Sequence, residues 1–128
     1  MIGNRPRDTR PEVAVRSILH RRGLRFRTRF TIRLGGRRWT QPDIVFTRAR
    51  LAVYVDGCFW HCCPEHGTKP EANADYWQTK LMRNVARDRD TDARLSAIGW
   101  TVLRAWEHEP PEELANRIDA LLTEANRN

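Results

Sequence analysis

The chain of 128 residues has few cysteines, few lysines and no long apolar run. No apolar stretch approaches the roughly 20 residues that a membrane helix needs. The Arg-rich N-terminus also lacks the apolar segment of a signal peptide, so we expect a cytoplasmic protein with no membrane contact. Hydrophobic residues make up 40% of the chain and charged residues 30%, which excludes an intrinsically disordered protein. We therefore expect one globular domain over residues 1–128, since this length supports a single core of ordinary size.

The three cysteines, Cys58, Cys62 and Cys63, all fall inside six residues. An odd number of clustered cysteines in a chain expected in the cytoplasm argues against a disulfide framework and favours a metal site. Cys58, Cys63 and His66 supply soft and borderline ligands, and His108 can return after the last apolar run to complete a tetrahedral zinc site. A closed site of four ligands is structural, and it would fix the Cys/His-rich loop to the end of the last predicted strand. A permutation between Cys62 and Cys63 stays open.

Lysine is scarce, because 21 of the 23 basic residues are arginines. The 16 acidic residues leave a net charge of +7. Arginine makes bidentate contacts with phosphates and guanine edges, so this excess favours a nucleic-acid partner. A GC-rich genome also enriches arginine, and this compositional origin remains the alternative.

Hydrophobic spacing and turn residues divide the chain into seven elements. Helical spacing, with capping residues, prolines or glycines at the ends, predicts helices over residues 10–22, 74–98 and 110–122. Short apolar or alternating runs predict strands over residues 25–33, 42–46, 51–55 and 100–106. The second and third strands form a hairpin in the sheet centre. The order α-β-β-β-α-β-α predicts an α/β fold in which a mixed sheet is flanked by helices.

Two aspartates stand at neighbouring ends of the predicted hairpin. Asp43 lies where the first strand enters the sheet, and Asp56 ends the partner strand thirteen residues later. Converging carboxylates supply the hard oxygen ligands that Mg²⁺ prefers. A metal there would neutralise a scissile phosphate and activate water. The alternative for Asp43 is an ordinary aspartate at a turn or strand start.

His61 follows Asp56 closely enough in the chain to reach the same cleft. Imidazole is the side chain best suited to move a proton near neutral pH, so His61 is a catalytic candidate. A zinc ligand and a surface residue are the alternatives for this histidine.

Two aromatic pairs, Phe59-Trp60 and Tyr76-Trp77, stand in polar and basic surroundings. Core packing is the commoner fate of a tryptophan. The alternative is a wedge that enters a DNA groove and unstacks a base step. The other tryptophans are assigned to packing or to the sheet: Trp39, Trp100 and Trp106.

Residues 83–90 of the long helix alternate in charge. Such runs usually form a solvated helix face that carries salt bridges. We expect this of most of these residues.

The chain resembles the very-short-patch-repair (Vsr) DNA mismatch endonucleases in blocks that come in the family's order, at residues 8–12, 42–43, 57–61, 76–77, 84–88 and 99–107. The Gly-Cys-Phe-Trp-His run and the later Trp-Glu block are the most specific. The resemblance implies a restriction-endonuclease-like fold and a Mg²⁺-dependent nick in double-stranded DNA, 5′ to the thymine of a T:G mismatch left by deaminated 5-methylcytosine. We expect a monomer that shares a pathway with a cytosine-5 methyltransferase and repair proteins.

The same resemblance implies roles for individual residues. It matches the metal-binding aspartate to Asp43, the catalytic histidine to His61, the aspartate that supports this histidine to Asp88, and the acid of the first helix to Glu12. The aromatics that intercalate beside the mismatch match Phe59, Trp60 and Trp77.

The chain also departs from the family pattern. Asp56 stands where the best-known member has a second active-site histidine, so Asp56 is a candidate Mg²⁺ ligand. The zinc set has two cysteines and two histidines, where that member uses one histidine and three cysteines; a tetrahedral set survives. The chain starts seven residues before Asp8, so we expect no extended N-terminal arm on the DNA.

Two other functions stay open. A related restriction- or homing-type endonuclease would cut without mismatch preference, and cleavage of fully paired DNA would favour it. A zinc-stabilised DNA-binding module without chemistry would use Asp43 and Asp56 only structurally. Metal-dependent nicking that Asp43→Asn abolishes would exclude such a module.

Overall fold

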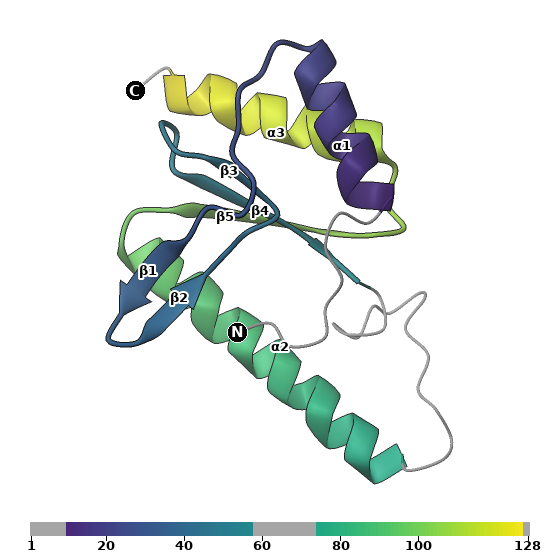
Figure 1. The fold of residues 1–128 in the computed structure, drawn as a ribbon, viewed down its shortest axis with the longest axis vertical. Helices are drawn as coiled ribbons and strands as arrows, with labels where there is room; N and C mark the ends of the chain where they lie inside the picture. Colours follow the sequence, from purple (N-terminus) through teal and green to yellow (C-terminus); the bar gives the residue numbers. More distant parts are fainter. Residues whose placement is uncertain (1–9, 58–73, 127–128) are drawn as a thin grey trace.

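A computed structural model describes residues 10–57 and 74–126 of the chain. In these ranges the elements follow in the order α1 (Arg10–Arg21), β1 (Ile32–Gly35), β2 (Arg38–Thr40), β3 (Ile44–Phe46), β4 (Leu51–Asp56), α2 (Ala74–Ala97), β5 (Thr101–Trp106) and α3 (Pro111–Asn126) (Figure 1). The three predicted helices are confirmed, with α3 reaching four residues further than expected. Among the described helices, none is both long and apolar enough to cross a bilayer.

The main sheet has three strands in the order β3-β4-β5. β3 and β4 are antiparallel, with Ile44 opposite Val53, which confirms the predicted hairpin. Its predicted place in the sheet centre is right for β4 only, because β3 is an edge strand of this sheet. β4 and β5 run parallel, with Asp56 opposite Trp106 at their ends. Parallel neighbours need a long crossover connection, and α2 lies in it. The predicted mixed sheet flanked by helices is therefore confirmed, with β4 in its centre.

β4 is buried along its whole length, and its side chains alternate between two apolar cores. Leu51, Val53 and Val55 pack in a core with residues of α1 and α3. Ala52 and Tyr54 face the opposite side, where they pack with side chains of β1 and α2. Figure 1 shows the same layers, with α1 and α3 on one side of the sheet and α2 on the other. The next residue on the α2 side of β4 is Asp56, so the alternation directs a carboxylate toward this helix.

The predicted strand over residues 25–33 is wrong for most of its length. The strand begins only at Ile32, and the earlier residues make a single antiparallel bridge, between Arg27 and Val45. Phe26 packs against the first core and Phe30 against the second, although side chains four apart in a strand share one face. The chain therefore passes from one side of the sheet to the other, and Arg29 makes the bend with a φ of 56°.

A second, two-stranded sheet follows this bend. The predicted Gly35-Gly36 turn is confirmed, since both glycines have positive φ values of 101° and 58°. The return strand β2 was not predicted from the sequence. Its Trp39 is 37% exposed, while Trp100 packs against the second core as expected.

Candidate active site

Asp43 stands directly before β3, as the sequence predicts, and its carboxylate reaches the neighbouring strand. Its Oδ2 accepts a hydrogen bond of 2.7 Å from the backbone amide of Val55. Val55 is the residue before Asp56, so the two candidate ligands approach the same end of the β3–β4 hairpin. A backbone amide orients a carboxylate without cancelling its charge.

Asp56 is only 5% exposed, and both of its oxygens accept a hydrogen bond from a cation. Arg104 Nη1 donates to Oδ1 over 3.0 Å and to Oδ2 over 3.2 Å. Arg104 lies on β5, two residues before Trp106, which pairs with Asp56. These bonds to both oxygens orient the Asp56 carboxylate toward Arg104.

The guanidinium of Arg104 also binds two aspartates of α2. Nε and Nη2 form a fork on Asp92, with distances of 2.8–3.0 Å, and Nη2 lies 3.8 Å from Asp88. Asp88 and Asp92 are four residues apart and so share one helix face. Burial by itself would lower the pKa of Arg104, but the hydrogen bonds of Asp92 and the charges of the three aspartates outweigh burial and raise this pKa above its ordinary value.

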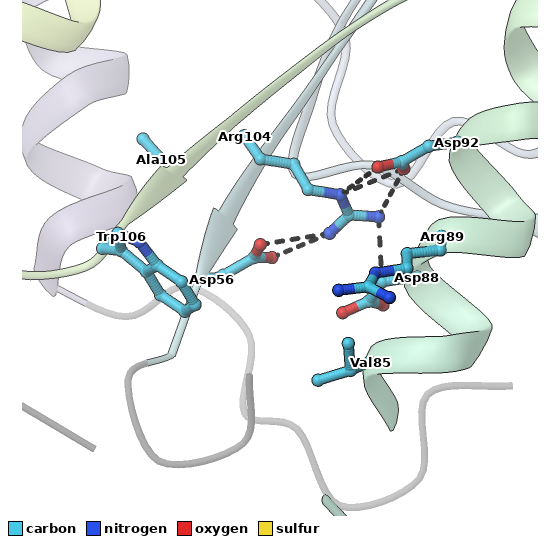
Figure 2. Close-up of a pocket in the computed structure, with 8 residues that line it drawn as sticks. All are labelled: Asp56, Val85, Asp88, Arg89, Asp92, Arg104, Ala105 and Trp106. Carbon is cyan, nitrogen blue, oxygen red and sulfur yellow. Dashed lines mark hydrogen bonds and ion pairs between the residues drawn. The ribbon is translucent and has the colours of Figure 1, made fainter. Parts of the chain in front are cut away.

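A pocket of about 220 Å³ opens between the ends of β4 and β5 and the middle of α2. Figure 2 shows Asp56, Arg104 and Asp88 turned toward one another across it. Its lining is Asp56, Val85, Asp88, Arg89, Asp92, Arg104, Ala105 and Trp106. Asp88, which the resemblance matches to the aspartate that supports the histidine, thus faces the pocket together with Asp56.

The ring of Tyr54 packs against the guanidinium of Arg104. The guanidinium carbon lies 4.1 Å from the centre of the Tyr54 ring, a cation–π contact. The Tyr54 hydroxyl shares a hydrogen bond of 2.7 Å with Thr40 of β2. Burial raises the pKa of Tyr54 to about 12, although the Thr40 bond and the charge of Arg104 act in the opposite direction.

The two carboxylates at this edge have the donor chemistry that Mg²⁺ prefers. Mg²⁺ is usually held by one or two protein carboxylates, with water and substrate phosphates completing its ligand shell. Over residues 10–57 and 74–126, no group of three or more histidine, cysteine, aspartate or glutamate side chains is arranged to hold a metal. Asp43 and Asp56 would supply two protein carboxylates, which is within the one or two that Mg²⁺ usually has.

Of the four predicted zinc ligands, Cys58, Cys63 and His66 lie outside the described residues. The fourth, His108, lies in the turn that follows β5. The Glu107 amide donates a hydrogen bond of 2.9 Å to the Asp56 carbonyl. This bond places Glu107, the residue before His108, beside Asp56, which precedes Cys58 by two residues. Sulfur and imidazole are the ligands that zinc prefers.

The remaining predicted residues differ in how the structure places them. Glu12 is buried in the first turn of α1. In Figure 1 the start of α1 lies on the same side of the molecule as the ends of β4 and β5. His61, Phe59 and Trp60 lie outside the described residues, as does the side chain of Trp77 on α2.

The charged run over residues 83–90 has two roles. Asp90 accepts hydrogen bonds from Arg38 over 2.7 Å and from Arg94 over 2.9 Å, which confirms a solvated face with salt bridges. The Arg94 bond is the main cause of a lowered pKa of Asp90. Asp88 instead belongs to the pocket.

Sequence reasoning missed Arg104 and Asp92. A detectable signal was present, because Arg104 is the single charged residue in the apolar strand 100–106. A buried cation needs an acidic partner, and Asp88 and Asp92 supply carboxylates at one-turn spacing on the preceding helix.

Comparison with known proteins gives a consistent set of relatives. The model of a family described as DNA mismatch endonuclease Vsr matches residues 1–71. The type II nicking enzyme V.NaeI of Lentzea aerocolonigenes is 49% identical over 122 residues, which cover 95% of this chain and 72% of that protein. The type II nicking enzyme V.XorIIP of Xanthomonas oryzae pv. oryzae is 44% identical over 109 residues, 82% of this chain and 74% of that protein. The DNA mismatch endonuclease Vsr of Escherichia coli K12 is 38% identical over 102 residues, 79% of this chain and 62% of that protein.

Proposed function

The chain belongs to the Vsr family of DNA mismatch endonucleases, and we propose that it nicks double-stranded DNA 5′ to the thymine of a T:G mismatch in a Mg²⁺-dependent reaction. As a family member it is a DNA endonuclease. The small mixed sheet flanked by helices fits the restriction-endonuclease-like fold. The observation that carries the proposal is the hydrogen bond from the Val55 amide to the Asp43 carboxylate. Val55 precedes Asp56 on the central strand β4, so the bond brings Asp43 to the strand end that carries Asp56.

Asp43 and Asp56 have the task of holding Mg²⁺ against the scissile phosphate. When bound there, the ion offsets charge on the phosphate oxygens and lowers the pKa of a bound water. Asp43 contributes a carboxylate fixed by the Val55 amide, and Asp56 one fixed by Arg104. Both side chains are therefore oriented before DNA arrives, which lowers the cost of organising the site.

His61 is the proposed proton-transfer group. It follows Asp56 by five residues, and Asp88 on the opposite pocket wall is the carboxylate proposed to orient it. Such an imidazole takes a proton from the attacking water or gives one to the leaving 3′ oxygen. Zinc bound by Cys58, Cys63, His66 and His108 would fix the segment that carries His61 to the end of β5.

Mismatch recognition is assigned to Phe59, Trp60 and Trp77. When aromatic side chains enter a base stack, the added contact area offsets the free-energy cost of unstacking. This cost is lower at a T:G pair than at a matched pair. The net charge of +7 supplies attraction to phosphates at every sequence. Aromatic insertion and general attraction together would place the mismatch beside Asp43. The resulting nick would start very short patch repair.

Nicking without mismatch preference is the second candidate function. Two relatives with 49% and 44% identity are named type II nicking enzymes, and neither name mentions a mismatch. This candidate shares the same catalytic groups, and only the recognition step differs.

End-labelled duplexes separate the two candidates. Purified protein is incubated with Mg²⁺ and duplexes that carry T:G, each other mismatch or no mismatch, and the labelled strand is resolved on a denaturing gel. We expect a nick 5′ to the mismatched thymine in Mg²⁺ and none in EDTA. Equal nicking of matched duplexes would select the second candidate, and undiminished nicking in EDTA would overturn the metal-dependent mechanism.

A further inference from the structure

Three carboxylates from two elements surround the guanidinium of Arg104. Asp56 approaches from the end of β4, and Asp88 and Asp92 approach from one face of α2 (Figure 2). Three like charges this close repel one another, and the 5% exposure of Asp56 limits the screening of its charge by water. The pocket geometry therefore depends on the cation at its centre.

The guanidinium is held on its edges and on its face. Nε and Nη2 are bonded to Asp92, and Nη1 is bonded to Asp56. One face of the group lies over the Tyr54 ring, and the Tyr54 hydroxyl is bonded to Thr40. A planar group fixed in these directions cannot rotate without breaking several contacts, so its partners also have fixed positions.

Arg104 is poorly placed to bind DNA itself. Its side chain is 20% exposed, and hydrogen bonds to Asp56 and Asp92 engage all three of its nitrogen atoms. A phosphate would have to displace a carboxylate from the same N–H groups. The contacts therefore point inward, to the carboxylates that line the pocket.

We propose that Arg104 is a positioning residue of the nicking reaction, which holds the carboxylates of Asp56 and Asp88 at the pocket wall against their mutual repulsion. The role assigned to it rests on the proposed function, because the reaction needs Asp56 beside the metal and Asp88 beside His61. Arg104 acts through these two aspartates and touches neither DNA nor metal. The fork on Asp92 anchors Arg104 to α2.

Two variants and a matched control test this role. Arg104→Met keeps the length of the apolar stem and removes the cation, while Arg104→Lys keeps the charge and removes the fork. Arg94→Met is the control, because it removes an arginine from an exposed pair with Asp90 on α2. A displacement of about 1 Å in a catalytic group costs on the order of 100-fold in rate.

The measurements are kcat and KM on the T:G duplex, duplex affinity in EDTA, and melting temperature. We expect Arg104→Met to lower kcat by about 100-fold with KM and affinity within about twofold of wild type. Arg104→Lys should recover part of the loss, and Arg94→Met should match wild type. A folded Arg104→Met protein with wild-type kcat would overturn the proposal. Weaker affinity with unchanged kcat would also overturn it and make Arg104 a DNA contact.

Asp92→Asn gives a second route if Arg104→Met fails to fold. Asparagine keeps one acceptor oxygen but loses the negative charge and the second acceptor, so the fork on Arg104 is weakened while Asp56 and Asp88 are unchanged. We expect a smaller fall in kcat with KM unchanged. A wild-type kcat for a folded Asp92→Asn protein would contradict the anchoring role.

The Nε–H resonance of Arg104 in the DNA-free protein tests the fixed guanidinium without any nicking. We expect this proton to exchange with water far more slowly than that of Arg94, and Asp92→Asn to speed the exchange. Exchange as fast as that of Arg94 would overturn the proposal. If the proton is protected but wild-type protein nicks no duplex, the proposed function fails while the fixed positions of the carboxylates stand.

Discussion

Asp43 Oδ2 accepts a hydrogen bond of 2.7 Å from the backbone amide of Val55. The bond continues the pairing of β3 with β4 beyond Ile44, using a side-chain oxygen in place of a backbone carbonyl. Because an amide oxygen also accepts such a bond, Asn at position 43 can keep the contact with Val55 while it removes the negative charge. This makes position 43 well suited to separate structure from chemistry.

Asp43→Asn should abolish metal-dependent nicking while the protein still folds and binds DNA. Several kcal/mol of charge stabilisation disappear with the metal, which lowers the rate by about three orders of magnitude. DNA binding is kept because the loss of one negative charge does not weaken attraction to phosphate. Asp43→Ala, which also removes the Val55 bond, should cost about 1 kcal/mol of unfolding free energy in addition. Wild-type nicking by Asp43→Asn would remove Asp43 from the metal site.

His61→Ala should lower the nicking rate by about 10²–10⁴-fold, the usual contribution of a general acid or base. Zinc should stay bound, because the proposed ligands do not include His61. Elemental analysis and single-turnover nicking, measured on the same preparation, check both points. Zinc loss in this variant would make His61 a ligand and leave the proton-transfer role without a residue.

The purified protein should contain about one equivalent of zinc in a four-ligand site. His108→Ala should release it and lower the melting temperature by more than about 4 °C, since losing about 1 kcal/mol has this effect in a domain of similar size. His20→Ala is the matched control, because His20 is an exposed histidine near the end of α1. Elemental analysis that finds no zinc in wild-type protein would refute the site.

Trp60→Ala or Trp77→Ala should weaken binding of the T:G duplex by about 1–3 kcal/mol, the usual contribution of an aromatic ring stacked on a base. Trp39→Ala serves as control, since Trp39 is 37% exposed on β2 and has no proposed role in recognition. Affinities for T:G and matched duplexes are compared in EDTA to prevent nicking. Unchanged affinity and selectivity in both variants would assign these side chains to the core.

Tyr54 should make the fold sensitive to alkaline pH. Its pKa is about 12 in the folded protein against 10.0 for an ordinary tyrosine, so folding favours the protonated hydroxyl. The stabilisation is complete below pH 10 and is lost as the pH rises through 12; a shift of two units corresponds to about 2–3 kcal/mol. In a Tyr76→Phe background, Tyr54 is the only tyrosine, and its absorbance near 295 nm should change only around pH 12. A transition near pH 10 in folded protein would contradict its burial.

The sequence predicted the helices and the β3–β4 hairpin because their apolar periodicity and turn residues agree. It failed over residues 25–33, where alternation suggested one straight strand. The failure has a physical cause: Phe26 and Phe30 have the spacing of one strand face but enter different cores, and local periodicity contains no information about a bend between cores.

The residues of the candidate site differ in how readily the sequence reveals them, for a related reason. Asp43 and Asp56 could be found because each lies at a strand end close to the other in sequence. Arg104 and Asp92 were missed because their roles depend on a tertiary contact between β5 and α2. A lone arginine within an apolar strand signals that a partner exists, but only the fold identifies which aspartates it meets.

The distance along the chain between Asp56 and Arg104 affects when the enzyme becomes active. The two residues are 48 positions apart, and they meet only when β5 pairs in parallel with β4. Pairings across such a long loop form slowly, because the entropy of loop closure is lost before their contacts are gained. During synthesis, Asp43 and Asp56 leave the ribosome well before Arg104 does. A nascent chain therefore has both proposed metal ligands before the cation that positions Asp56, and we expect hydrolytic competence only after Arg104 has been synthesised and β5 has paired with β4.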